Sequence, residues 1–416
     1  MAQKFIDQTT IQPDGKPGDD AFTAFATCND NFHDAEQRLT TLEAVGQDVE
    51  ILKTGLQQEG DARLLGDDTL GQRIEAEQAA RQAQAEALGW RIVGDNAFLN
   101  GDFRFWERGT SFVAPAYTAD RWYFNAGGVA SPNVIRNPIS PGQFASIRAP
   151  AFARVSYGAV TDPAGHFVVY EQLIEDAGTY AGETVTISFK VYNSGQAGRR
   201  IALELRQNFG AGGSTTLSGI GARKFTLAAG LNAITHTVQV PSVAGKTFGA
   251  NNSLGFAFWA SAGSNWNARS DSLGAQAGDV HFTEVKIERG ATATSFQQRP
   301  EALERLLCQR YCYAYEVTTG NAFVLCHGLG NSQVLAFLEA PTDMRTIPTA
   351  RSVGAPPTLT GVGMAGGASI VGQSYIPVSK RTVALVATAN QATTGSASGY
   401  LGSGSQPYRV LFEAEL

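Results

Sequence analysis

Cysteine and long apolar runs are both scarce in this sequence of 416 residues. The four cysteines, Cys28, Cys308, Cys312 and Cys326, are too few for a disulfide scaffold in a chain of this length, so we expect assembly in a reducing cytoplasm. No run of about 18 apolar residues occurs, and the N-terminus has no apolar segment. The sequence therefore predicts no membrane insertion and no secretory signal.

Charge is also sparse, and it is unevenly placed. Charged residues make up 17% of the chain, below the roughly 25% of ordinary soluble domains. The net charge is -6, but the stretch from Asp34 to Trp90 holds 12 acidic and 5 basic residues, so the remainder is nearly neutral and has no basic patch. Because phosphate binding needs clustered Lys and Arg, we do not expect nucleic acid as a partner.

The motifs of common enzyme classes are missing as well. No GxxxxGK[ST], GxSxG, HExxH or EF-hand loop occurs, so nucleotide hydrolysis, serine hydrolysis and zinc proteolysis lack their enabling residues. A zinc set of Cys308, Cys312, Cys326 and His327 is disfavoured, because Cys326 and His327 are neighbours on a predicted strand and point to opposite faces. We expect a protein without catalytic activity.

A proline-free stretch rich in Gln, Glu and Ala predicts long helices in the first quarter of the chain. Five apolar residues in it follow a heptad spacing and predict an oligomerisation seam: Leu42, Val45, Val49, Leu52 and Leu56. Glycines at 46, 55, 60, 66 and 71 interrupt the pattern, which predicts a segmented coiled-coil stalk over residues 34–92. The alternative is a lone amphipathic helix packed on the rest of the chain.

After Trp90 the apolar period changes to two, as in ETVTISFKVY, LGFAFWA and DVHFTEVKIE. Clusters of Gly, Asn and Ser separate these stretches without helical segments between them, which favours antiparallel sheets. We expect a mainly β protein with an N-terminal α-helical stalk. In this interpretation a coiled coil precedes two antiparallel β-sandwich domains, over residues 93–300 and 301–416.

Four stretches carry motifs that occur together in one family. The first is DGKPGDDAFTAFATCNDNF, with Asn-Asp-Asn-Phe at 29–32, and the second is NAFLNGDFRFWERGTSFVAPAYTADRWYF. The third is ERGATATSFQQRPEALERLLCQRY, and the fourth pairs APTDMRTIPT with the terminal FEAEL. Together they resemble the tail fibres, or receptor-binding proteins, of tailed bacteriophages.

This resemblance implies a homotrimer in the virion tail, in which a trimeric coiled coil precedes two jelly-roll-like β-sandwich domains. Residues 1–33 would attach to tail or baseplate proteins, and residues 93–300 would form a sandwich similar to carbohydrate-binding modules. Residues 301–416 would form the tip that meets a bacterial receptor, whether glycan, pilus or outer-membrane protein. Two alternatives stay open: a polysaccharide depolymerase tailspike, and a structural fibre segment that carries another adhesin.

Receptor contacts are expected where aromatic residues lie in polar loops. Trp266 with Asn265, Asn267 and Arg269 is the preferred candidate, and Tyr400 in a Gly/Ser-rich loop is the second. Trp106, Trp122 and Trp259 are expected in the core instead.

The similarity to carbohydrate-binding modules also implies one structural Ca²⁺, with Asn100, Asp102 and Asp279 as oxygen ligands. No other cofactor is expected. Glycosidase chemistry would need two carboxylates across a cleft, and we expect structural roles such as turn capping instead for the acids of the first sandwich: Asp102, Asp120, Asp279, Glu284 and Glu288.

Overall fold

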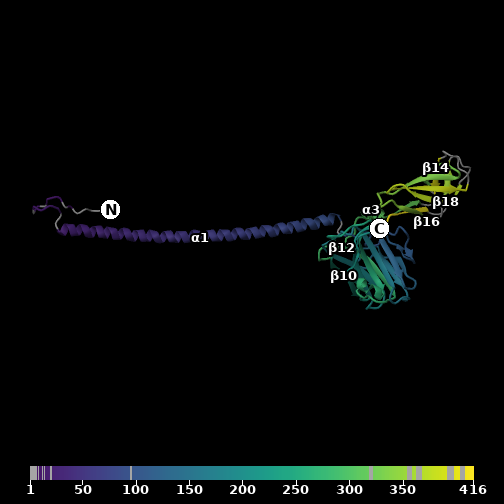
Figure 1. Cartoon of the computed structure of the whole chain (residues 1–416), viewed down its shortest axis with the longest axis horizontal. Coiled ribbons are helices and arrows are strands. Elements are labelled where there is room, and N and C mark those ends of the chain that lie inside the picture. Colours follow the sequence, from purple (N-terminus) through teal and green to yellow (C-terminus); the bar gives the residue numbers. More distant parts are fainter. Residues whose placement is uncertain are drawn as a thin grey trace. The chain divides into compact units, whose positions relative to one another are not determined.

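Figure 1 shows the computed structural model of the chain. The structure describes residues 7, 9–11, 13, 15–18, 21–93, 96–317, 322–353, 358–361, 368–390, 398–402 and 408–416. Of these, residues 78–93, 317, 322–323, 358–361, 368, 398, 400 and 402 are described by their backbone alone. The chain divides into two compact units, Met1–Ile92 and Val93–Leu416. In the described part, no helix has both the length and the hydropathy that a bilayer crossing needs.

The first unit is dominated by one α-helix, α1 (Ala21–Val93, 73 residues). It begins inside the expected attachment module and continues through all five glycines, so the segmentation predicted from them is wrong. A glycine inside a helix costs only about 1 kcal/mol relative to alanine, and the residues between the glycines are good helix formers. None of the described side chains of α1 is buried.

The heptad residues of α1 are uncovered in the single chain. Their side chains are between 53% and 71% exposed: Leu42, Val45, Val49, Leu52 and Leu56. Apolar residues at this spacing on a single helix gain burial only when another helix packs against them. A coiled coil of several copies stays a prediction.

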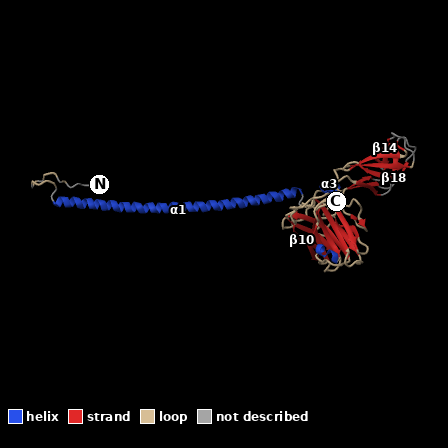
Figure 2. Cartoon of the chain, in the orientation of Figure 1, coloured by secondary structure: helices blue, strands red, loops and turns tan. Residues whose placement is uncertain are grey.

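A sandwich of two six-stranded antiparallel sheets begins the second unit (Figure 2). The first sheet has the strand order β1 (Ser111–Phe112), β4 (Asn133–Pro138), β5 (Ala151–Tyr157), β12 (Gly278–Arg289), β7 (Thr184–Asn193), β10 (Gly230–Gln239). The second has the order β2 (Ala116–Tyr117), β3 (Trp122–Gly127), β6 (Phe167–Glu175), β11 (Ser253–Ala262), β8 (Arg200–Asn208), β9 (Leu217–Thr226). The predicted class, mainly antiparallel β with an N-terminal helix, is confirmed.

The sandwich core is aromatic. Trp122 is fully buried and contacts the rings of Phe98, Phe103 and Tyr170 at centroid distances of 5.1 to 5.9 Å. Alternate residues of β7 face this core, as their period of two predicted. Trp106, Trp122 and Trp259 are all buried, as predicted, but only Trp106 and Trp122 belong to this core, whereas Trp259 lies in a smaller apolar cluster on the opposite face of β11.

The C-terminal strands follow a short helix, α3 (Glu301–Gln309), directly after Pro300. A three-stranded sheet has the order β13 (Cys312–Val317), β21 (Tyr408–Glu413), β16 (Thr349–Val353). Six more strands pair in the order β14 (Ala322–Gly330), β15 (Gln333–Glu339), β19 (Thr382–Ala389), β18 (Ala368–Pro377), β17 (Thr358–Gly361), β20 (Ser398–Gly402). β20 pairs again with β14. A second apolar core lies among these strands.

Buried ion pairs join the sandwich to the end of the C-terminal region. The Arg108 guanidinium donates to Glu413 at 2.6 Å and to Glu415 at 3.0 Å, and Arg121 also donates to Glu415. The side chains of both arginines are no more than 3% exposed, and that of Glu415 is 7% exposed. Because each charge is paired away from water, these contacts bind the two β regions into one compact unit.

Asp120 gives this junction a dependence on pH. Burial raises the pKa of its carboxyl to about 7, although Arg108 lies 3.9 Å away and acts in the opposite direction. An aspartate of the unfolded chain titrates near 3.9, so between about pH 4 and 7 the folded state binds the proton more tightly. The contribution of Asp120 to stability is therefore present below pH 4 and is lost as the pH rises through 7.

We expect the variant Asp120→Asn to gain stability relative to the parent chain as the pH rises from 5 to 8, because the variant has no carboxyl to ionise. Urea unfolding of both proteins at several pH values measures the difference. A difference that stays constant across this range would show that Asp120 is already ionised in the folded chain at pH 5.

Candidate functional site

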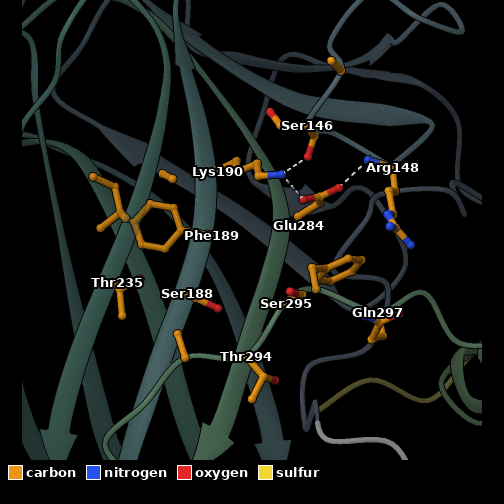
Figure 3. Close-up of a pocket in the computed structure, with 15 residues that line it drawn as sticks. Ser146, Arg148, Ser188, Phe189, Lys190, Thr235, Glu284, Thr294, Ser295 and Gln297 are labelled. Atoms are coloured by element: carbon orange, nitrogen blue, oxygen red, sulfur yellow. Dashed lines mark hydrogen bonds and ion pairs between the residues drawn. The ribbon is translucent and has the colours of Figure 1, made fainter.

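An open pocket of about 530 Å³ lies on the first sheet of the sandwich (Figure 3). Its floor is formed by β7 and β10 and includes Ser188, Lys190 and Thr235. Ile187, Phe189 and Val191 of β7 belong to the core, so the alternate residues Ser188 and Lys190 face outward. Segments 145–148 and 293–297 supply the rest of the lining together with Glu284 of β12.

A β-bulge directs Glu284 toward this pocket. The pairing of β12 with β7 shifts between Thr283 and Lys286, and Glu284 has a φ of +50°. Bulges leave one residue out of the ladder and change the direction of its side chain. Gly101 approaches the bulge closely, since its carbonyl accepts from Val285 N at 2.9 Å and a Cβ on Gly101 would clash with Val285 O.

The Glu284 carboxylate is neutralised by its neighbours. Lys190 Nζ lies 2.7 Å from Glu284 Oε2, and the backbone N–H groups of Arg148 and Ala149 donate to Oε1 at 2.5 and 3.3 Å. The Lys190 ammonium also donates to the carbonyl of Ser146. With its side chain 4% exposed and these three residues as donors, Glu284 is held in place as a structural anion.

Other polar groups of the pocket have no protein partner in the described part of the chain. They are the Arg148 guanidinium and the hydroxyls of Ser188, Thr235 and Ser295. Figure 3 shows Arg148 on the side of the pocket away from Thr235. A concave site with several donors available to a ligand is the usual form of a binding pocket for a polar molecule.

An aromatic cluster begins one residue before the pocket's Ala145. Phe144 contacts Phe152 and Tyr192 at centroid distances of 5.6 and 5.5 Å, and Tyr192 contacts His281 at 5.5 Å. Burial lowers the pKa of His281, and the nearby Asp279 offsets this only in part, so the imidazole is neutral near pH 7. The cluster is a packed border to the pocket.

The residues expected to hold calcium are engaged elsewhere. The carboxylate of Asp102 accepts from Arg104 and Gln298, whereas that of Asp279 accepts from Arg154 at 2.7 Å and from Ser194 at 2.6 Å. Asn100 uses its side-chain amide to bind the backbone of Phe105 and Asp120. Because the two carboxylates pair with different arginines, the structure gives Asn100, Asp102 and Asp279 no shared calcium site.

No group of three or more His, Cys, Asp or Glu side chains that could hold a metal occurs among the described residues. Cys326 is buried and His327 is exposed, so the neighbours face opposite sides of β14 as predicted. Burial raises the pKa of the thiols of Cys308 and Cys312 well above the ordinary value, which keeps both thiols protonated.

Trp266 is less available than expected. It ends the short 3-10 helix η1 (Ser264–Trp266), its ring is half-buried against Phe167 and Trp259, and its indole N–H donates to Gly165 O at 3.1 Å. The exposure predicted for this loop residue is wrong, because the loop folds back onto the outer face of β11 and forms a small apolar cluster there.

The other residues of that candidate differ in their surroundings. Arg269, in the short helix α2 (Asn267–Ser270), donates to the fully buried carboxylate of Glu204 and lies over the rings of Trp259 and Trp266. Asn265 and Asn267 are exposed. The guanidinium of Arg269 is thus committed to a structural ion pair, and only the two asparagines are open to a ligand.

Tyr400 lies in β20, where its backbone pairs with Leu325 and Thr360. Its side chain is outside the described part of the chain. The contribution of Tyr400 to receptor binding stays a prediction.

No sequence pattern points to Lys190 or Arg148 as site residues. Arg148 lies in a polar loop and Lys190 lies in an alternating strand segment, and only the fold brings these two residues next to Glu284. The local signal for a binding residue is that the loop ASIRAP contains one basic residue and no acidic one, and this signal is weak on its own.

No protein-family model and no curated protein matches the chain. Among solved structures, a family 11 carbohydrate-binding module from Clostridium thermocellum, in complex with a β-1,3-1,4-mixed-linked tetrasaccharide, is 13% identical. The match covers 44% of this chain and 97% of that module, with a TM-score of 0.27. A cyclase from Fischerella sp. TAU is 16% identical over 47% of this chain and 96% of its own, with a TM-score of 0.29.

A family 30 carbohydrate-binding module of a Clostridium thermocellum cellulase is 9% identical, over 45% of this chain and 96% of its own, with a TM-score of 0.25. These neighbours include binding modules and an enzyme. At such TM-scores the likeness carries no argument about what this chain does.

Proposed function

We propose that this chain is a tail fibre, or receptor-binding protein, of a tailed bacteriophage that attaches the virion to the bacterial surface without catalysis. The observation that carries the proposal is the combination in one chain of α1, with its exposed apolar seam, and a β-sandwich with an open polar pocket. The four sequence motifs similar to that family support it independently.

Each part then has a role. The seam of α1 holds three copies together, which multiplies weak surface contacts into avidity. Residues 1–33 attach the fibre to tail or baseplate proteins, and the β regions meet a receptor on the host. The location is the virion tail, after assembly in the host cytoplasm.

The pocket supports binding without hydrolysis. Glycoside hydrolysis uses two carboxyl groups, about 5 to 9.5 Å apart, on either side of the scissile bond. Among the residues that line this pocket, Glu284 is the one carboxylate, and Lys190 and two backbone N–H groups already neutralise it. The pocket can hold a polar ligand but lacks the acid and base for cleavage.

Direct binding to cells tests the proposal. The fluorescently labelled full chain is titrated onto a panel of bacteria, and the surface polysaccharide of each strain is assayed for new reducing ends. We expect saturable binding to at least one strain and no new reducing ends. New reducing ends would favour a depolymerase, and the absence of saturable binding to every strain would contradict an attachment function.

A further inference from the structure

Three charged side chains line the pocket on the first sheet, and their charges do not sum to zero. Lys190 and Glu284 form one ion pair, while the Arg148 guanidinium has no partner in the described part of the chain. The lining therefore carries one net positive charge. An open cation beside available hydroxyls is arranged for an anion that also carries hydroxyl groups.

We propose that this pocket binds the carboxylate of an acidic saccharide, with Arg148 as the residue that selects the acid over its neutral counterpart. The inference rests on the proposed function, because it names the class of host glycan that the sandwich would contact. The pocket's volume of about 530 Å³ is within the usual range of roughly 300 to 1,000 Å³ for small-ligand sites.

Two parts of the pocket would bind different groups of the ligand. Arg148 offers a planar fork of N–H donors that matches both oxygens of a carboxylate. The hydroxyls of Ser188 and Thr235 lie on the adjacent strands β7 and β10, where the two residues are directly paired. They can donate to, or accept from, hydroxyl groups of the same saccharide.

Glu284 holds the lining of the pocket in place and does not attract a cationic ligand. Its carboxylate holds Lys190 and the backbone at 148–149, which fixes the loop that carries Arg148. A ligand cation would gain little from Glu284, because this anion is buried and already accepts from three residues. The remaining charge available to a ligand is that of Arg148.

The test measures binding of the full chain to glucuronate and galacturonate, with glucose and galactose as neutral counterparts and glucose 6-phosphate as a second anion. Isothermal titration gives affinities, and NMR of the sugars by saturation transfer detects weak binding. We expect at least one uronate to bind about tenfold more tightly than its neutral counterpart and more tightly than the phosphate. Equal binding of acid and neutral sugar, tighter binding of the phosphate, or no binding of either uronate would overturn the proposal.

A matched pair of variants assigns the effect to Arg148. Arg148→Gln should lower the affinity for the uronate about tenfold and leave the affinity for the neutral sugar unchanged. The control is Arg223→Gln on β9 of the other sheet, where Arg223 is exposed and its guanidinium has no partner in the described part of the chain; this variant should bind as the parent does. Equal losses in both variants, or none in Arg148→Gln, would contradict the role of Arg148.

The outcome can be separated from that of the proposed function. If the parent chain binds cells saturably but shows no preference for uronates, the acidic-saccharide inference fails and attachment stands. If uronates bind at Arg148 and no bacterium is bound, the pocket assignment stands and the attachment function fails.

Discussion

Replacing Val49 and Leu52 together by aspartate should abolish the oligomer of the full chain at micromolar concentration. The two residues belong to the heptad seam of α1, and both are more than half exposed in the single chain. In a coiled coil they would be buried against other copies, where unpaired carboxylates are strongly unfavourable. Sedimentation velocity of the parent and the variant measures the change in mass.

The control carries the same added charge outside the seam. Gln47→Asp with Gln58→Asp places two carboxylates on α1 at positions that the heptad pattern leaves facing solvent. This variant should keep the oligomer of the parent. If the seam variant also keeps it, or if the parent itself is a monomer, the coiled-coil role of α1 is wrong.

Replacing Glu415 by alanine should destabilise the second unit by about 3 to 5 kcal/mol. Glu415 is the carboxylate that both Arg108 and Arg121 bind, and the side chain of Arg121 is 2% exposed. Without Glu415, Arg121 retains the carbonyl of Leu173 and the ring of Tyr311 but forms no other ion pair with a carboxylate of the described residues. Most of the loss arises from the positive charge left buried and unpaired.

Urea unfolding measures this loss. The matched control is Glu339→Ala on β15, because Glu339 is exposed and should change the free energy of unfolding by no more than about 0.5 kcal/mol. If the two variants unfold at the same urea concentration, the ion pairs at the junction contribute little and the two β regions are held together by other contacts.

The sequence predicted the type of each helix and strand better than it predicted where the helix α1 would be interrupted. The Gln/Glu/Ala-rich composition predicted helix where α1 lies, and a period of two predicted β7 and β12, because both signals are local. The glycines of α1 were given too much weight, since each lowers helix stability only slightly and the flanking residues favour the helix. Trp266 was expected in solvent because nothing local shows that its loop packs back onto β11.

The candidate site could not be predicted from the sequence, for a different reason. Arg148, Lys190 and Glu284 come from a loop and two strands, and they meet because β12 pairs with β7 at a bulge. Sheet pairing and bulge position are set by contacts between segments distant in the sequence, so no local pattern indicates them. The expected calcium ligands are kept apart by one local and one distant pairing, since Asp102 binds Arg104 two residues away and Asp279 binds Arg154 of β5.

Competition for adsorption is the decisive test of the proposed attachment function. Bacteria are incubated with increasing concentrations of the purified full chain, virions of the tailed phage proposed to carry it are added, and the fraction of virions left unadsorbed is counted. An attachment protein should occupy the receptor and raise the unadsorbed fraction in a saturable way, and the monomeric seam variant should require much higher concentrations because it lacks avidity. Unchanged adsorption at saturating concentrations of the parent chain would contradict the account.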